Sequence, residues 1–172
     1  MVDVRPDRKV RFNVLLTEDR ERGIEHWTRQ LPRLLEPQGF HAYVARTGRE
    51  ALEVAGRNEI HAAVIDLLTP SEDPARGRGE ADGLWLMQLL HRLPRRPPVV
   101  LVGAPPYGPR QVHRLLNEAL RLGVFSVVNR PVELEAMLEV IRRLIDRRYA
   151  GTWPPSGGGA GDADRGEGID SN

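Results

Sequence analysis

Short apolar segments alternate with amphipathic segments five times along this chain. The apolar segments are apolar on both faces, which is typical of strands buried between two layers. The amphipathic segments repeat their apolar residues at the three- and four-residue spacing of a helix. Parallel strands need a crossover connection, and the crossover helix covers one face of the sheet. The pattern therefore predicts an α/β fold, a doubly wound parallel sheet with helices on both sides.

The strands are expected at 10–17, 40–44, 61–65, 98–102 and 124–128. Helices are expected around 24–35, 51–56, 86–93, 112–119 and 134–145, and Pro94 is expected to end the third of them because proline lacks an N–H. Ligands of such sheets bind beyond the carboxyl ends of the strands. The residues that follow each strand are therefore the candidates for function.

The two ends of the chain differ in composition from its centre. Residues 1–9 are polar, and residues 150–172 are rich in Gly, Pro and Asp. Such segments bury too little apolar surface to offset the entropy of ordering. We therefore expect a flexible N-terminal tail over 1–9, one domain over 10–149, and a disordered C-terminal tail over 150–172 in which Trp153 is exposed.

The overall composition excludes several classes of protein. The net charge is +1, from 25 basic and 24 acidic residues, which gives no field that would attract nucleic acid or an anionic membrane. Cysteine is absent, which excludes disulfides and thiolate metal sites, and no apolar run reaches the roughly 18 residues of a membrane span. We expect a cytoplasmic protein that binds neither nucleic acid directly nor membranes.

Three carboxylates are expected at one edge of the sheet. Glu18 and Asp19 follow the first strand, and Asp66 follows the third. A single acidic residue at a strand end is commonly a loop residue or a helix cap. Three that converge repel one another unless a cation neutralises them, and oxygen ligands without His or Cys suit Mg²⁺. The sequence therefore predicts a magnesium site at this edge.

With these residues in place, the chain resembles the receiver domains of response regulators over roughly Arg11 to Tyr149. Glu18 and Asp19 match the acidic pair of that family, and Asp66 matches its phosphoacceptor. Two dipeptides also match: Arg130-Pro131 stands at the family's Lys-Pro site, and Asp82-Gly83 at the Asp-Gly that opens the third helix. The resemblance implies a flavodoxin-like (βα)5 receiver fold with strand order 2-1-3-4-5. It also implies that the backbone carbonyl of Leu68 is a ligand of the metal.

The same resemblance implies a function in two-component or phosphorelay signalling. Asp66 would accept a phosphoryl group from a sensor histidine kinase or a phosphotransfer protein, with Arg130 at the site and Mg²⁺ offsetting charge on the phosphoryl oxygens. The activity would be at most a magnesium-dependent self-phosphorylation, so the chain is not a conventional enzyme. It would signal to a downstream protein partner through the face of the fourth helix, fifth strand and fifth helix, where His113, Arg114 and Arg121 are exposed candidates. A homodimer is an open alternative.

Several residues depart from the family pattern. Gly103 stands where receivers carry a hydroxyl at the end of the fourth strand, and Val127 where they carry a mobile aromatic residue. Arg130 keeps the charge of the usual lysine with a planar guanidinium in place of a compact ammonium. The loop over 67–82 is also longer than usual. Gly103 and Val127 favour an alternative, a pseudo-receiver that acts as a phosphorylation-independent interaction or dimerisation module, whereas the retained Glu18, Asp19 and Asp66 favour the receiver.

A hydrolase or a nucleotide-binding domain on the same type of sheet is a weaker alternative. No P-loop and no GxGxxG follows the first strand. The histidines have neither metal-ligand spacing nor a serine placed for a triad. His26, His61 and His113 are therefore expected to be surface or helix-face residues.

Overall fold

A computed structural model describes residues 11–18, 27–72, 82–103 and 108–153 of the chain. Strands and helices alternate, as the sequence pattern predicts, with one short 3₁₀ helix between the first helix and the second strand. The elements in chain order are β1 Phe12–Thr17, α1 Trp27–Leu35, η1 Glu36–Gln38, β2 Phe40–Ala45, α2 Gly48–Arg57, β3 Ala62–Asp66, α3 Asp82–Leu90, β4 Val99–Val102, α4 Pro109–Arg121, β5 Ser126–Val128 and α5 Leu134–Arg148.

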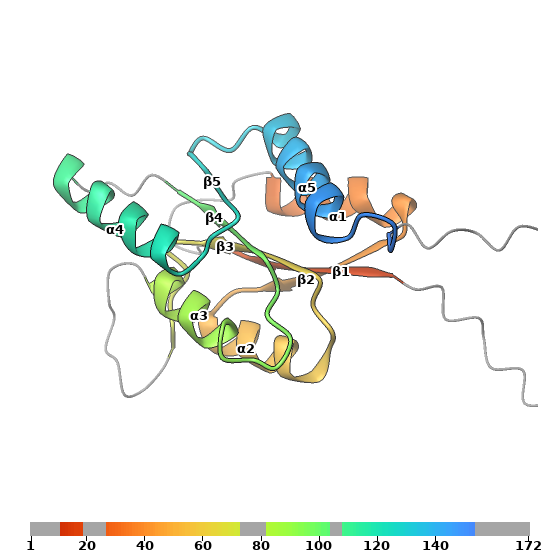
Figure 1. Cartoon of the computed structure of the whole chain (residues 1–172), viewed down its shortest axis with the longest axis horizontal. Coiled ribbons are helices and arrows are strands. Elements are labelled where there is room, and N and C mark those ends of the chain that lie inside the picture. Colours follow the sequence, from red (N-terminus) through yellow and green to blue (C-terminus); the bar gives the residue numbers. More distant parts are fainter. Residues whose placement is uncertain (1–10, 19–26, 73–81, 104–107, 154–172) are drawn as a thin grey trace, which may run out of the picture.

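The five strands form one parallel sheet in the order β2-β1-β3-β4-β5, which confirms the predicted fold class and strand order (Figure 1). β3 lies at the centre, and its last residue, Asp66, is level with Val102 of β4. The third helix ends at Leu90, earlier than the expected stop at Pro94, because tighter hydrogen bonds such as Arg92 N to Leu89 O turn the chain there.

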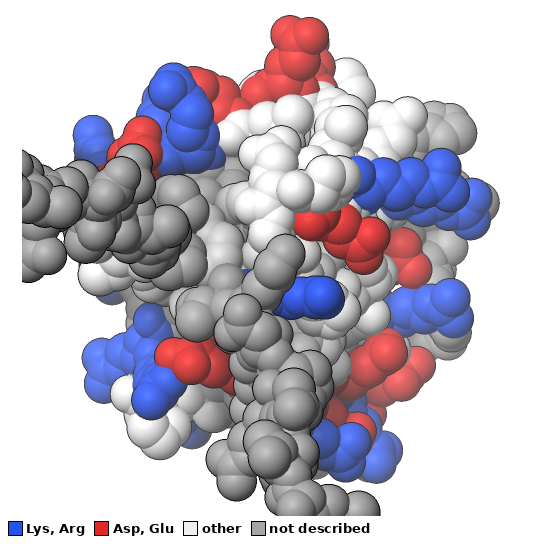
Figure 2. All heavy atoms as spheres, turned by 90° about the vertical axis from the view of Figure 1, so that its right-hand side faces the viewer, with Lys and Arg blue, Asp and Glu red and all other residues white. Residues whose placement is uncertain are grey.

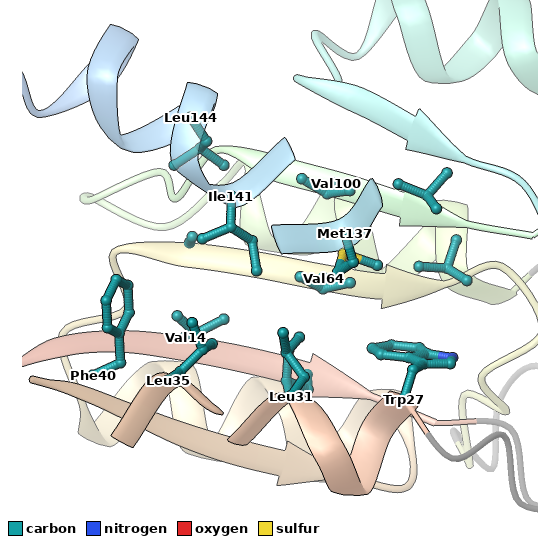
Figure 3. Close-up of a cluster of buried hydrophobic side chains, with 14 of the residues drawn as sticks. Val14, Trp27, Leu31, Leu35, Phe40, Val64, Val100, Met137, Ile141 and Leu144 are labelled. Atoms are coloured by element: carbon teal, nitrogen blue, oxygen red, sulfur yellow. The ribbon is translucent and has the colours of Figure 1, made fainter. Parts of the chain in front are cut away.

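Each face of the sheet carries its own apolar layer. Helices α1 and α5 cover one face, where Leu31, Met137 and Ile141 pack on Val64 and its neighbours (Figure 3). Helices α2, α3 and α4 cover the other face, and the two layers together bury both sides of β1, β3 and β4. A strand buried on both faces needs no polar alternation, which explains why these segments are continuously apolar in the sequence.

The chain continues past α5 and docks Trp153 against the sheet. The Trp153 ring lies 5.4 Å from the Phe12 ring and 5.9 Å from the Phe40 ring. Gly39, with a left-handed φ of +90°, lies directly beneath it. The expectation that Trp153 is exposed in a tail is therefore wrong, because the apolar partners it finds on β1 and β2 outweigh its polar neighbours in sequence. The predicted tails over 1–9 and beyond Trp153 lie outside the described residues.

His61 belongs to the same aromatic cluster and is only partly exposed, where a surface or helix-face residue was expected. Its ring stacks on Phe12 at 5.0 Å, and its Nδ1 accepts a 2.9 Å hydrogen bond from the backbone N–H of Asn13. The Tyr149 hydroxyl donates to the His61 carbonyl at 2.5 Å. Burial lowers the pKa of His61 and raises the pKa of Tyr149.

Figure 2 shows the molecule from the right-hand side of Figure 1. Charges of both signs are interspersed on this face. No helix among the described residues has the length and apolar character needed to cross a membrane.

Candidate functional site

Asp66 lies at the carboxyl end of the central strand and is 1 % exposed. Its backbone N–H donates to Thr17 Oγ1 at 2.9 Å, and Thr69 Oγ1 donates to the same hydroxyl at 2.7 Å. These buried threonines tie the ends of β1 and β3 together. Sequence analysis missed both, although a hydroxyl residue directly before the Glu18-Asp19 pair was a usable signal.

Each oxygen of the Asp66 carboxylate has a partner. Oδ1 accepts a 2.9 Å hydrogen bond from the backbone N–H of Leu68, and Oδ2 forms an ion pair with Nη2 of Arg130. The side chains are 2 % exposed for Asp66 and 17 % for Arg130. Burying a carboxylate is costly unless a cation and hydrogen bonds compensate it, and Arg130 with Leu68 provide both. The predicted placement of Arg130 beside Asp66 is what the structure has.

Gly103 leaves room for the Arg130 side chain. It directly follows β4 with φ +126°, and its N–H donates to Val128 O at 3.0 Å. A Cβ built on Gly103 would lie 3.7 Å from Arg130 Nε and 3.8 Å from the Cβ of Leu67. A larger side chain there would extend into the space of the guanidinium and would also be strained by the positive φ. The missing hydroxyl and the arginine are therefore two parts of one arrangement.

The segment that follows Asp66 is fastened to the start of α2. Gly48 N–H donates to Pro70 O at 2.8 Å, and Arg49 N–H donates to Ser71 O at 3.1 Å. Thr47 caps α2 by accepting from Glu50 N–H at 3.1 Å, which fixes the helix end that receives this segment. The first part of the long loop predicted over 67–82 is thus ordered through residue 72, and the rest, 73–81, lies outside the described residues.

The Asp82-Gly83 dipeptide opens α3, as expected, and contacts the segment that follows Asp66 from the other side. Asp82 Oδ2 accepts a 3.0 Å hydrogen bond from Ser71 N–H. A Cβ at Gly83 would lie 2.5 Å from Asp66 O and 2.7 Å from Leu67 Cα, closer than real contacts allow. Only glycine therefore lets α3 begin this close to the backbone of Asp66.

The acidic pair is only partly described. Glu18 is hydrogen-bonded through its N–H to Ala45 O at 3.2 Å, and its carboxylate lies 3.4 Å from Nε of Arg46. Asp19 lies outside the described residues. The structure therefore does not test whether Glu18, Asp19 and Asp66 converge.

The predicted ligands are oxygen donors of the kind that Mg²⁺ prefers, and of the three carboxylates Asp19 lies outside the described residues. Among the described residues, no group of three or more His, Cys, Asp or Glu side chains is placed to hold a metal ion. The two predicted carboxylate ligands that are described, Glu18 and Asp66, are both paired with arginines. The Leu68 N–H faces the Asp66 carboxylate, and the assignment of the Leu68 carbonyl as a ligand stays a prediction.

Away from this site, Val127 packs half-buried on the α2–α3–α4 side of the sheet. Helix α4 presents a basic surface, and an open depression there is lined by Arg110, His113, Arg114, Asn117, Glu118 and Arg121. Leu120, on the same helix, is 64 % exposed.

Comparison with known proteins identifies the fold. No family model and no curated protein matches the sequence. Solved structures do match: a putative response regulator from Chloroflexus aurantiacus is 18 % identical, with a TM-score of 0.60 over 80 % of this chain and 99 % of that one. A CheY-like receiver domain protein from Methanospirillum hungatei is 18 % identical, with a TM-score of 0.60 over 80 % and 95 %. A sensor protein from Polaromonas is 24 % identical, with a TM-score of 0.58 over 80 % and 98 %.

Proposed function

Because the chain has the fold of response-regulator receiver domains, we propose that it is a receiver in two-component or phosphorelay signalling and accepts a phosphoryl group on Asp66. One observation carries the proposal: a buried carboxylate at the carboxyl end of the central strand, paired with the guanidinium of Arg130. An ionised carboxylate beside a cation can act as a nucleophile. The same cation can then offset the negative charge of the phosphoryl group that the carboxylate has accepted. The donor would be a sensor histidine kinase or a phosphotransfer protein.

In the proposed reaction, an Asp66 oxygen attacks the phosphorus of a phosphohistidine. The P–O bond forms as the P–N bond breaks, and the electron pair returns to the imidazole nitrogen, which takes up a proton. Oδ1 stays hydrogen-bonded to Leu68 N–H, and Oδ2 is the reacting oxygen. Arg130 moves from Oδ2 to the transferred phosphoryl oxygens, where charge-assisted hydrogen bonds from a guanidinium are strong.

Magnesium enters the proposal as a prediction. Glu18, Asp19, Asp66 and the Leu68 carbonyl are the residues that would hold it, and the ion would offset charge on the phosphoryl oxygens. The described carboxylates among these residues, Glu18 and Asp66, are paired with arginines.

A pseudo-receiver is the second candidate, favoured by the surroundings of Gly103. Gly103 has no side chain and so lacks the hydroxyl that receivers place beside the phosphoryl group. Its left-handed φ also disfavours any residue that could carry one. Arg130 already covers the oxygen that would react. In this candidate the fold serves as a phosphorylation-independent surface for a protein partner or a second copy of the chain.

The test is intact mass after incubation with acetyl phosphate, with and without Mg²⁺, for the wild type and for Asp66→Asn. We expect one phosphoryl adduct in the wild type and none in Asp66→Asn, because the amide has no nucleophilic carboxylate oxygen. An adduct that persists in the variant would reject Asp66 as the acceptor. No adduct in either protein would favour the pseudo-receiver.

For the output, we propose that the face of α4, β5 and α5 contacts the downstream partner. The exposed His113, Arg114 and Arg121 of α4 suit an acidic surface, and the half-buried residues of β5 leave the sheet edge open beside them.

A further inference from the structure

We infer that Arg130 competes with divalent cations for Asp66, so that the resting site binds Mg²⁺ or Mn²⁺ weakly until the guanidinium is displaced. This inference rests on the assignment of the acceptor site in the proposed function and adds a form of regulation to it. It concerns the resting protein and needs no phosphodonor to be tested.

Both oxygens of the Asp66 carboxylate already have partners in the resting protein. Mg²⁺ needs a carboxylate oxygen at about 2.0–2.1 Å. Of the two oxygens of Asp66, Oδ1 accepts from Leu68 N–H and Oδ2 is in contact with Nη2 of Arg130. An ion on Oδ2 would lie next to the guanidinium, and two like charges that close repel strongly away from bulk water. Oδ1 has a lone pair left beside the Leu68 bond, but an ion there would still be separated from the guanidinium by only one carboxylate. The two cations therefore weaken each other's binding at Asp66.

The fold also holds the arginine in place. Arg130 follows β5, next to the end of β4, and its side chain is only 17 % exposed. Gly103 and Leu67 border it, and Gly103 contributes no side chain that would keep it away from Asp66. A guanidinium so enclosed loses little entropy when it pairs, so the ion pair is hard to displace.

The carboxylate of Glu18, which follows β1, is held far less firmly than that of Asp66. Arg46 and Glu18 lie 3.4 Å apart, with side chains that are 58 % and 27 % exposed. Exposed ion pairs contribute little and give way easily to water or ions. Arg130, and not Arg46, therefore sets the affinity of this edge for a cation.

The experiment is a titration of the full chain with Mn²⁺, in which the free ion is measured by its electron paramagnetic resonance signal. We expect Arg130→Gln to bind Mn²⁺ at least about tenfold more tightly than the wild type, since a full positive charge beside the ligand oxygen is removed. The double variant Arg130→Gln with Asp66→Asn should lose this gain. Arg143→Gln breaks another arginine–carboxylate pair, with Glu139 on α5, and should bind as the wild type does.

Because Arg130→Gln leaves a buried carboxylate without its cation, the melting midpoint is measured against Mn²⁺ concentration as well, with Arg130→Lys as a milder variant. Mn²⁺ should raise the midpoint of Arg130→Gln far more than that of the wild type, with Arg130→Lys in between. Equal affinities and equal midpoint shifts in the wild type and Arg130→Gln would overturn the inference. Failure of acetyl phosphate labelling would instead count against the proposed function alone.

Discussion

At the scale of single residues, Gly83 allows the start of α3 to lie against the segment that follows Asp66. A methyl group there would lie 2.5 Å from the backbone oxygen of Asp66, so that α3 or the strand end must move. We expect Gly83→Ala to lower the free energy of unfolding by about 2–3 kcal/mol, as forced overpacking does. Urea unfolding measures the change, and acetyl phosphate labelling should fall with it.

Gly56 provides the matched control, because it lies in α2 and a Cβ there would meet nothing within 4 Å. Gly56→Ala should be neutral or stabilising by about 0.5–1 kcal/mol, since alanine favours the helix. Equal losses in the two variants would mean that the close approach at Gly83 carries no special strain.

Gly103 yields a second prediction at this scale. Receivers carry a hydroxyl residue here, but the φ of +126° means that Gly103→Thr cannot simply restore one. We expect this variant to lose about 1–3 kcal/mol of stability, because a β-branched residue is strained in the left-handed region. Urea unfolding is the measurement, and a threonine tolerated without loss would contradict the strain assigned to Gly103.

At the scale of elements, the segment after α5 stabilises the amino-terminal ends of β1 and β2. Trp153 contacts Phe12 and Phe40, and aromatic pairs of this kind contribute about 0.5–1.5 kcal/mol each beyond their burial. We expect Trp153→Ala to lower the free energy of unfolding by about 1–3 kcal/mol. Leu34→Ala, at a residue that is 42 % exposed on α1, is the control and should change it by less than about 1 kcal/mol. Similar effects of the two changes would mean that Trp153 is not anchored.

The elements themselves could be predicted because their signals are local. A continuous apolar run marks a strand buried on both faces, and a three- to four-residue apolar spacing marks its covering helix. The docking of Trp153 could not, because its partners on β1 and β2 are far away in sequence and its own neighbours are polar. The composition of a segment describes its average tendency and not the contacts of one large side chain.

The candidate site could likewise be predicted only in part. The family pattern placed Asp66 at the end of β3 and Arg130 after β5, at the same end of the sheet, and the structure pairs them across β4. The bonds from Gly48 and Arg49 to the segment after Asp66, and the clearance at Gly83, depend on backbone geometry that has no signature in residue type. The sequence therefore identified Asp66 and Arg130 as candidates for one site, and the structure was needed to show that the guanidinium pairs with the carboxylate.

At the scale of the whole molecule, stability should depend on pH through its partly buried histidines. Burial lowers the pKa of His61 below its ordinary 6.5, with Glu59 opposing and Arg95 assisting the shift. Burial and then Arg96 lower the pKa of His91. As the pH falls through 6.5, the unfolded chain takes up these protons before the folded chain does. The free energy of unfolding then falls with pH, because the state that binds more protons is favoured.

We therefore expect a loss of stability that begins as the pH drops below about 7 and continues down to the lowered pKa values of the folded state. Protonation of His61 at Nδ1 also removes the acceptor of the hydrogen bond from Asn13 N–H. His61 should therefore account for most of the lost stability. His61→Gln keeps a side-chain acceptor without the titration, and it should flatten the dependence of urea midpoints on pH between 7 and 5, whereas His91→Gln should flatten it less. If His61→Gln leaves the slope of the urea midpoint against pH unchanged, other groups cause the acid sensitivity. The aromatic cluster around Phe12 would then stabilise the amino-terminal ends of β1 and β2 equally at pH 7 and pH 5.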